Sequence, residues 1–89
     1  MDYKKFVCIR SIENPKANFL CTAPCFCNIY NGDTVVAKAK GSEFDGVVYA
    51  SIDVDAGGEM ERFIRDSFRV SETEELPRII GKRQVYMFE

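Results

Sequence analysis

The clearest alternation of apolar and polar positions lies in the middle of the chain and predicts a β-hairpin. Its first strand follows the turn Asn31-Gly32-Asp33 and directs small apolar side chains to one face. These side chains are Val35, Ala37 and Ala39. Lys40-Gly41-Ser42-Glu43 is the predicted reversal, with Gly41 at positive φ. The return strand, 44–54, carries one continuous apolar face, and Gly46 within it predicts a bulge or bend.

The segments on either side of this hairpin predict three more strands. Residues 3–12 and 17–22 are expected to pair across a turn at Asn14-Pro15. The first of these strands is apolar on both faces around Phe6, which suits a strand that is covered on both sides. Residues 84–88 are expected to form a final strand that closes an open edge of the sheet.

Residues 59–69 predict one amphipathic helix. Its apolar stripe, Met60, Phe63, Ile64 and Phe68, is expected to cover an open end of a barrel. Glu61 and Arg65 are four residues apart, and we expect them to form a surface pair worth about 0.3 kcal/mol. Farther along, the segment 74–81 is expected to form a short helical turn, with Pro77 near its start and Gly81 at its end.

Together these elements predict a single α+β domain over residues 1–89, a size typical of one domain. The expected fold is a small, curved antiparallel sheet of about five strands, partly or fully closed into a barrel, with one packed helix over 59–69. No apolar run approaches the roughly 20 residues that span a bilayer. The N-terminal segment lacks the apolar core of a signal peptide, so we expect a cytoplasmic protein with reduced thiols.

The residue types exclude several kinds of catalysis. The chain has no histidine, which removes Ser-His-Asp and Cys-His nucleophilic sites and imidazole metal ligands. Gly57-Gly58 lacks the phosphate-loop motif and is better explained as a flexible lead-in to the helix. The acidic pairs Asp53/Asp55 and Glu74/Glu75 are more simply solvated than catalytic. The sequence therefore predicts a protein that is not an enzyme and needs no cofactor.

The cysteines offer one alternative, a zinc-stabilised module. Its ligands would be Cys8, Cys21, Cys25 and Cys27. Their spacing lacks the paired C-x2-C steps of zinc ribbons and fingers, and a C-x-C step strains a shared tetrahedral ion. A turn centred on Asn14-Pro15 would place Cys8 opposite Cys21, and a slip of one residue would separate them. Buried free thiols are the simpler interpretation.

The basic residues offer a second alternative, a small barrel that binds single-stranded nucleic acid by charge and stacking. Its candidate residues are Lys38, Lys40, Lys82, Arg83 and Tyr86. Lys38 and Lys40 project from the same face of one predicted strand. Lysines also protect exposed strand edges from aggregation. The net charge of −2 opposes attraction of a polyanion to the surface as a whole.

The central segment resembles small Src-homology-3-like barrels. The resemblance rests on Gly32, Asp33, Val35, Val36, Gly41, Gly46, Val47 and Val48. The chain also looks like short barrel proteins of phage and bacterial mobile elements that add a helix and a segment like Ile79-Ile80-Gly81. The resemblance covers about half of the chain and implies a fold. Related barrels in primosomal helicases bind DNA ends, but no helicase motif is present and no binding residue is transferred.

Taken together, the sequence favours a non-catalytic binding or adaptor module that acts through a partner protein or through self-association. The absence of catalytic residue types, combined with a barrel whose edges invite strand addition, supports this hypothesis.

Overall fold

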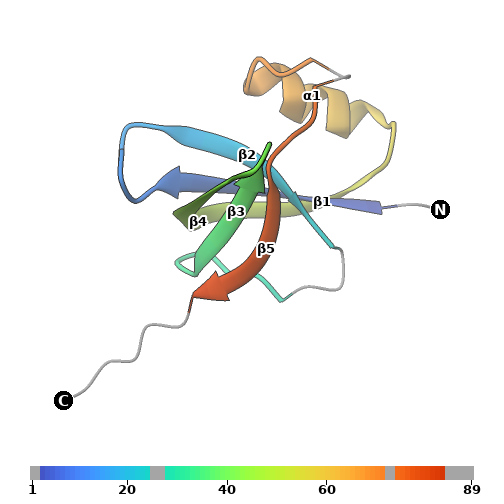
Figure 1. Cartoon of the computed structure of the whole chain (residues 1–89). Helices are drawn as coiled ribbons and strands as arrows, with labels where there is room; N and C mark the ends of the chain where they lie inside the picture. The colour runs from blue at the N-terminus through green and yellow to red at the C-terminus, as the bar shows by residue number, and fades with distance from the viewer. Residues whose placement is uncertain (1–2, 25–27, 72–73, 84–89) are drawn as a thin grey trace.

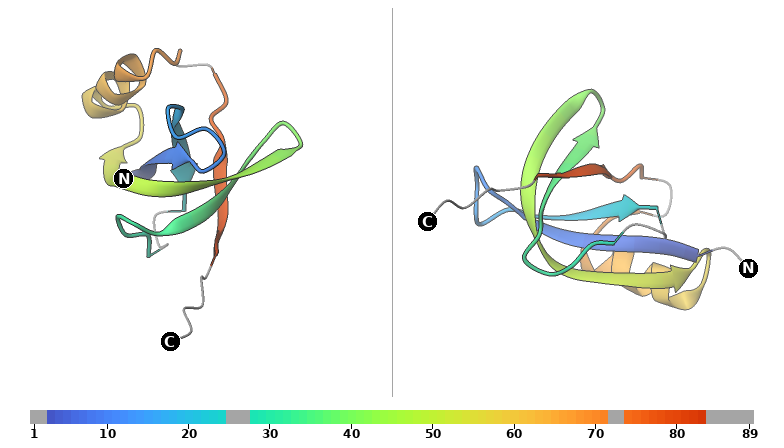
Figure 2. Two further views of the ribbon diagram at one scale, coloured as in Figure 1. Left: turned by 90° about the vertical axis from the view of Figure 1, so that its left-hand side faces the viewer. Right: turned by 90° about the horizontal axis from the view of Figure 1, so that it is seen from below.

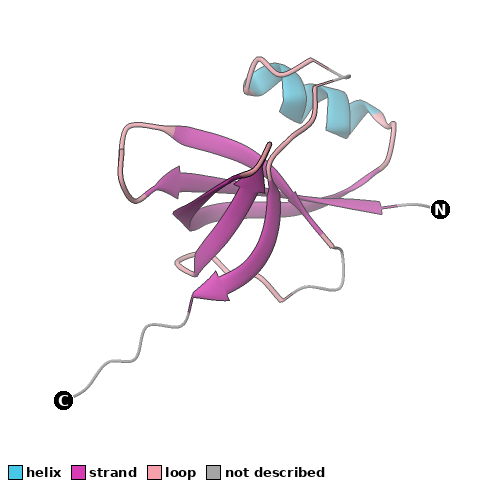
Figure 3. Ribbon diagram, in the orientation of Figure 1, coloured by secondary structure: helices cyan, strands magenta, loops and turns pink. Residues whose placement is uncertain are grey.

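The computed structural model describes residues 3–24, 28–71 and 74–83, which fold as a small barrel with one helix (Figures 1 and 3). The elements are β1 (Tyr3–Ser11), β2 (Asn18–Ala23), β3 (Thr34–Ala39), β4 (Ser42–Asp55), α1 (Glu59–Ser67) and β5 (Arg78–Arg83). The strands close the barrel in the order β1-β2-β5-β3-β4. The expected five strands and one helix are confirmed, and the barrel is closed. The sheet is not antiparallel throughout, as was expected, because β2 and β5 pair in parallel.

The strand that closes the barrel is β5, in the segment for which a helical turn was expected. That expectation is wrong because Ile79 is buried in the barrel and pairs with Ala37 of β3. Local signals from Pro77 and Gly81 could not reveal this burial. The predicted strand 84–88 lies outside the described residues.

The central β-hairpin is confirmed. β3 and β4 pair up to Ala39 and Ser42, so only Lys40 and Gly41 form the turn. Their φ angles are 48° and 85°, and positive φ at both central residues is typical of the type I′ turn that suits twisted hairpins. Val35 and Ala37 are fully buried, as the alternation predicts. β4 is the longest strand and curves around the barrel (Figure 2).

The alternation over 44–54 predicted that β4 presents one apolar face along its whole length. This prediction is wrong. Ile9 pairs with Val48 and Cys8 pairs with Ala50, so Tyr49 has no counterpart on β1 and the strand bulges there. Val48 therefore packs inside the barrel, whereas Val54 packs on the outer side. A bulge of one residue has this effect because side chains alternate along a strand.

Gly46 serves close packing rather than the bulge. A Cβ added at this position would lie 2.7 Å from Cδ1 of Ile9 and 3.1 Å from the carbonyl oxygen of Arg10. The residue is buried where β4 crosses β1. Gly46 therefore did indicate a packing constraint in β4. The bulge, however, lies three residues after Gly46, at Tyr49.

Two apolar clusters lie on opposite faces of β1 and β2. The barrel interior holds Val7, Ile9, Cys21, Ile29, Val35, Ala37, Val48 and Ile79. The outer cluster holds Phe6, Leu20 and Val54, against which Ile64, Phe68 and Leu76 pack. β1 is thus covered on both faces, as its composition predicts. The helix covers the outer side of these strands rather than an open barrel end.

The buried face of α1 differs from the predicted apolar stripe. Glu61 and Arg65 are each 7% exposed and face the barrel with Ile64 and Phe68. Met60 and Phe63 are 51% and 66% exposed. The expectation of a solvated Glu61–Arg65 pair is therefore wrong. Among the described residues, no helix is long and apolar enough to cross a membrane.

Candidate functional site

The seam between β2 and β5 is the weakest join in the barrel. β1 pairs with β2 from Lys5–Ala23 to Arg10–Asn18, whereas β2 and β5 share the single bridge Thr22–Arg78. At this bridge the Thr22 N–H donates to the carbonyl oxygen of Pro77 at 2.9 Å. Before Arg78 the chain turns away from β2 toward the helix (Figure 1). Part of the β2 edge is therefore left beside an opening.

The backbone groups of Asn18 and Leu20 face this opening. N–H and C=O groups alternate sides along a strand, and those of Thr22 point toward β5, so those of Leu20 and Asn18 point the same way. In the described part of the chain, no backbone hydrogen bond joins either residue to segment 74–77. Leu20 is buried, whereas Asn18 is exposed at the start of β2.

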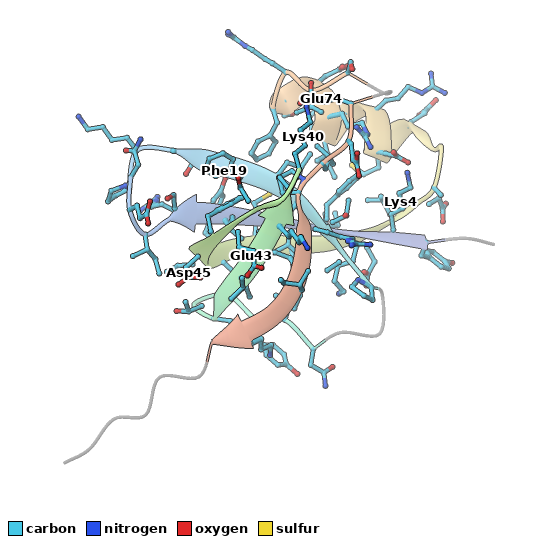
Figure 4. The ribbon with its side chains drawn as sticks, viewed as in Figure 1. Lys4, Phe19, Lys40, Glu43, Asp45 and Glu74 are labelled. Atoms are coloured by element: carbon cyan, nitrogen blue, oxygen red, sulfur yellow. The ribbon has the colours of Figure 1, made fainter. Side chains whose placement is uncertain are left out.

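A groove of about 550 Å³ adjoins this free edge, and we call it the seam groove. It is lined by residues 18–20 of β2, 39–40 of the hairpin, 68 and 70 after the helix, and 74–77 before β5. Figure 4 shows Phe19, Lys40 and Glu74 at this end of the barrel. Phe19, Phe68 and Leu76 give the groove apolar walls. The site thus combines free backbone groups with apolar contact surface.

Phe19, which lines the groove, packs against a second aromatic ring. The rings of Phe19 on β2 and Phe44 on β4 lie 4.8 Å apart at an interplanar angle of 50°. Tilted pairs at this distance are favourable beyond the area that they bury. Phe19 is therefore held in place by the barrel before any ligand arrives.

The opposite wall is held by Arg65 of α1. Its guanidinium NH1 donates to the carbonyl oxygens of Ser71 at 2.9 Å and Glu74 at 3.2 Å. Its Nε donates to Oε2 of Glu61 at 3.1 Å. Arg65 thereby ties the segment that leads into the groove wall to the helix.

Glu61 is the centre of this buried polar network. Its carboxylate accepts hydrogen bonds from Arg65, from Nζ of Lys4 at 3.1 Å and from the Gly57 N–H at 2.8 Å. Burial by itself would raise the pKa of Glu61, but these donors together lower it below its usual value. A cavity of about 520 Å³ beside the network is lined by the same cations. Because Glu61 already pairs with Lys4 and Arg65, we assign the network a structural role.

Charges of both signs surround the mouth of the seam groove. Lys38 pairs with Arg78 across β3 and β5, and Lys40 follows at the hairpin turn. A smaller cavity of about 220 Å³ extends the groove between these cations and Glu75. Lys40 holds its position with φ of 48°, a conformation that costs energy for a residue other than glycine. Such strain is frequent where a side chain has a function.

The structure does not gather the predicted nucleic-acid residues into one patch. Lys38 and Lys40 lie at the groove, whereas Lys82 pairs with Val35, about 10 Å from Lys38 along β3 by strand geometry. Lys82 forms an ion pair with Asp33 at 3.0 Å and lies 5.3 Å from the ring centroid of Tyr30. The backbone N–H of Tyr30 donates a hydrogen bond to the Asp33 carboxylate, and this bond lowers the pKa of Asp33. Lys82 lowers the same pKa to a smaller extent. Arg83 pairs through its backbone with Thr34, and Tyr86 lies outside the described residues.

Cys8 and Cys21 do not meet, because the predicted register between them is wrong by one residue. Cys8 pairs with Leu20, and Cys21 pairs with Val7. Cys21 lies in the barrel interior and Cys8 in the outer cluster, so the sheet separates them. Burial raises the pKa of Cys8, and it raises the pKa of Cys21 to about 12, so both thiols are protonated at neutral pH.

The other two proposed zinc ligands, Cys25 and Cys27, lie outside the described residues. Within the described ranges, no group of three or more His, Cys, Asp or Glu side chains is arranged to hold a metal ion.

Sequence reasoning missed most of the groove residues. Phe19 was expected only as part of the strand 17–22, Phe68 was expected in the apolar stripe of the helix, and Arg78 was placed in a helical turn. No local signal could have joined them, because the groove is formed by four segments and only the last two are close in sequence. The charge pattern singled out the two lysines at its mouth and the pair Glu74/Glu75, which was expected to be solvated.

Comparison with known proteins gives no relative from which a site could be transferred. No protein-family model, no curated protein and no solved structure matches this chain. The resemblance to Src-homology-3-like barrels stays a prediction, and any function must be argued from the groove itself.

Proposed function

We propose that this chain is a non-catalytic binding module that holds an extended peptide segment of a protein partner in the seam groove. The free β2 edge at Asn18 and Leu20, next to apolar walls, is the observation that supports the proposal. In strand addition, backbone hydrogen bonds supply affinity and pockets for alternate side chains supply specificity. The groove offers both.

The charges of the groove favour a peptide over nucleic acid. Lys38, Lys40 and Arg78 would attract phosphates, but Glu74 and Glu75 lie beside them and would repel a polyanion. A peptide can place apolar side chains between Phe19 and Leu76 and a single carboxylate near Lys40. The partner segment is therefore expected to be extended, mainly apolar and acidic at one end.

The test is a screen of extended peptides for binding, with contacts mapped by NMR. Binding should shift the backbone amide signals of Asn18 and Leu20 and protect them from hydrogen exchange. Asn18→Pro removes one edge N–H without touching the β1 ladder, and Asn18→Ala keeps that N–H as a matched control. We expect roughly tenfold weaker binding for the proline variant alone, since an unpaired backbone group costs about 1–3 kcal/mol.

Two results would contradict the proposal. One is the absence of peptide binding by a folded chain. The other is equal binding by the proline and alanine variants, with circular dichroism showing both to be folded. Binding of a single-stranded oligonucleotide at low salt, lost on charge reversal of Lys38 and Lys40, would favour the nucleic-acid alternative instead.

A further inference from the structure

The six residues that follow β5 have the sequence expected of an edge-adding strand. They read Gln84-Val85-Tyr86-Met87-Phe88-Glu89. Val85 and Met87 alternate with Tyr86 and Phe88, so an extended segment here would be apolar on both faces. Such a strand is stable only where both faces are covered, as they are for β1 of this barrel. The seam groove provides apolar walls on two sides of a free edge.

This segment starts at the wrong end of the barrel to fill its own groove. β5 begins with Arg78, beside Lys38 and the groove, and ends with Arg83, beside Thr34. To return from Arg83 to the level of Arg78, the chain must cover roughly 16 Å, which takes about five residues of extended chain. Within residues 84–89 only about one residue would remain for pairing, whereas pairing of this segment with 18–20 requires three. The groove of another molecule has no such restriction.

The charges agree with this assignment. Glu89 follows the apolar residues directly, and the mouth of the groove carries Lys38, Lys40 and Arg78. Resting on the function proposed above, we infer that the groove takes residues 84–89 of a second copy of this chain. The copies would join head to tail, because Arg83, which the donor segment follows, and the groove lie at different ends of β5. Such contacts are heterologous and produce rings or filaments.

The experiment uses the full chain and two variants with complementary defects. Asn18→Pro impairs the groove and leaves residues 84–89 intact. Tyr86→Pro removes an N–H from the donor segment and leaves the groove intact, and Tyr86→Phe is its control. Analytical ultracentrifugation should show concentration-dependent association of the wild type and the Tyr86→Phe variant. Each proline variant should be monomeric by itself, and a mixture of the two should form a dimer of one molecule of each.

Four results would overturn the inference. Association that persists in both proline variants would place the contact elsewhere, for example on the exposed Met60 and Phe63 of α1, and would overturn the inference. Failure of the two variants to form the mixed dimer would also overturn it. A wild type that stays monomeric but binds unrelated extended peptides would refute self-association alone. A monomer that binds no peptide would refute the proposed function as well.

Discussion

Glu61 and Arg65 form a buried ion pair one helical turn apart, with Nε of Arg65 3.1 Å from Oε2 of Glu61. Both side chains are on the face of α1 that packs against the barrel. The remaining donors of Arg65 reach the carbonyl oxygens of Ser71 and Glu74, so the pair connects the helix to the segment that precedes β5. Removing Glu61 would leave the buried Arg65 without a carboxylate, and removing Arg65 would leave the buried Glu61 with Lys4 as its remaining cation.

Arg65→Met should lower the free energy of unfolding by about 3 kcal/mol, because breaking a buried pair from one side is strongly destabilising. Urea denaturation measures this change. Asp66→Asn, on the exposed side of the same helix, is the control and should have an effect within about 0.5 kcal/mol. The double variant Glu61→Leu/Arg65→Met should recover most of the loss, since apolar replacements of buried pairs are often tolerated. A double variant less stable than Arg65→Met would contradict this account.

Stability should fall as the medium becomes acidic, in part through Glu61. Its pKa in the folded chain lies below the usual 4.5, so its ionised form stabilises the fold. This contribution is present above the unfolded pKa and disappears as pH falls through the folded pKa. Urea midpoints measured from about pH 7 to about pH 3 should therefore decrease more steeply for the wild type than for Glu61→Gln. Parallel curves would show that Glu61 is not linked to stability.

Gly46 and Gly81 offer a matched pair of strand glycines. Gly46→Ala places a Cβ 2.7 Å from Ile9 and 3.1 Å from a backbone oxygen, so the strands must shift. We expect a loss of about 1–3 kcal/mol, as for other overpacked cores. Gly81→Ala meets nothing within 4 Å and should change stability by less than about 0.5 kcal/mol. Thermal unfolding of the two variants compares them directly, and equal melting temperatures would rule out the close approach at Gly46.

Lys40→Asn should raise the stability of the fold and weaken peptide binding. Asparagine tolerates positive φ better than lysine and precedes glycine in the preferred type I′ turn, so the variant should gain a few tenths to about 1 kcal/mol. The same change removes a cation from the mouth of the seam groove and should weaken binding of an acidic peptide. Melting temperature and peptide affinity measure the two effects. A variant that loses stability would show that Lys40 is not strained in the turn.

The sequence by itself determined the elements of this protein other than β5. The alternation of apolar and polar positions correctly predicted β3 and the hairpin turn at Gly41. This was possible because a strand with one buried face shows which side chains point inward in its own sequence. The two-sided apolar pattern around Phe6 correctly indicated a strand covered on both sides. The helix was also visible, although its contact face was not.

Only the tertiary structure decided which surfaces meet. One extra residue at Tyr49 moves the later half of β4 to the outer face, and one step of register moves Cys8 away from Cys21. The buried side of α1 depends on Glu61, whose partners Lys4 and Gly57 are supplied by β1 and the turn before the helix. Phe19 lines the seam groove and Arg78 lines the smaller cavity at its mouth because β5 closes the barrel against Thr22. These features depend on contacts between distant segments, which local periodicity cannot encode.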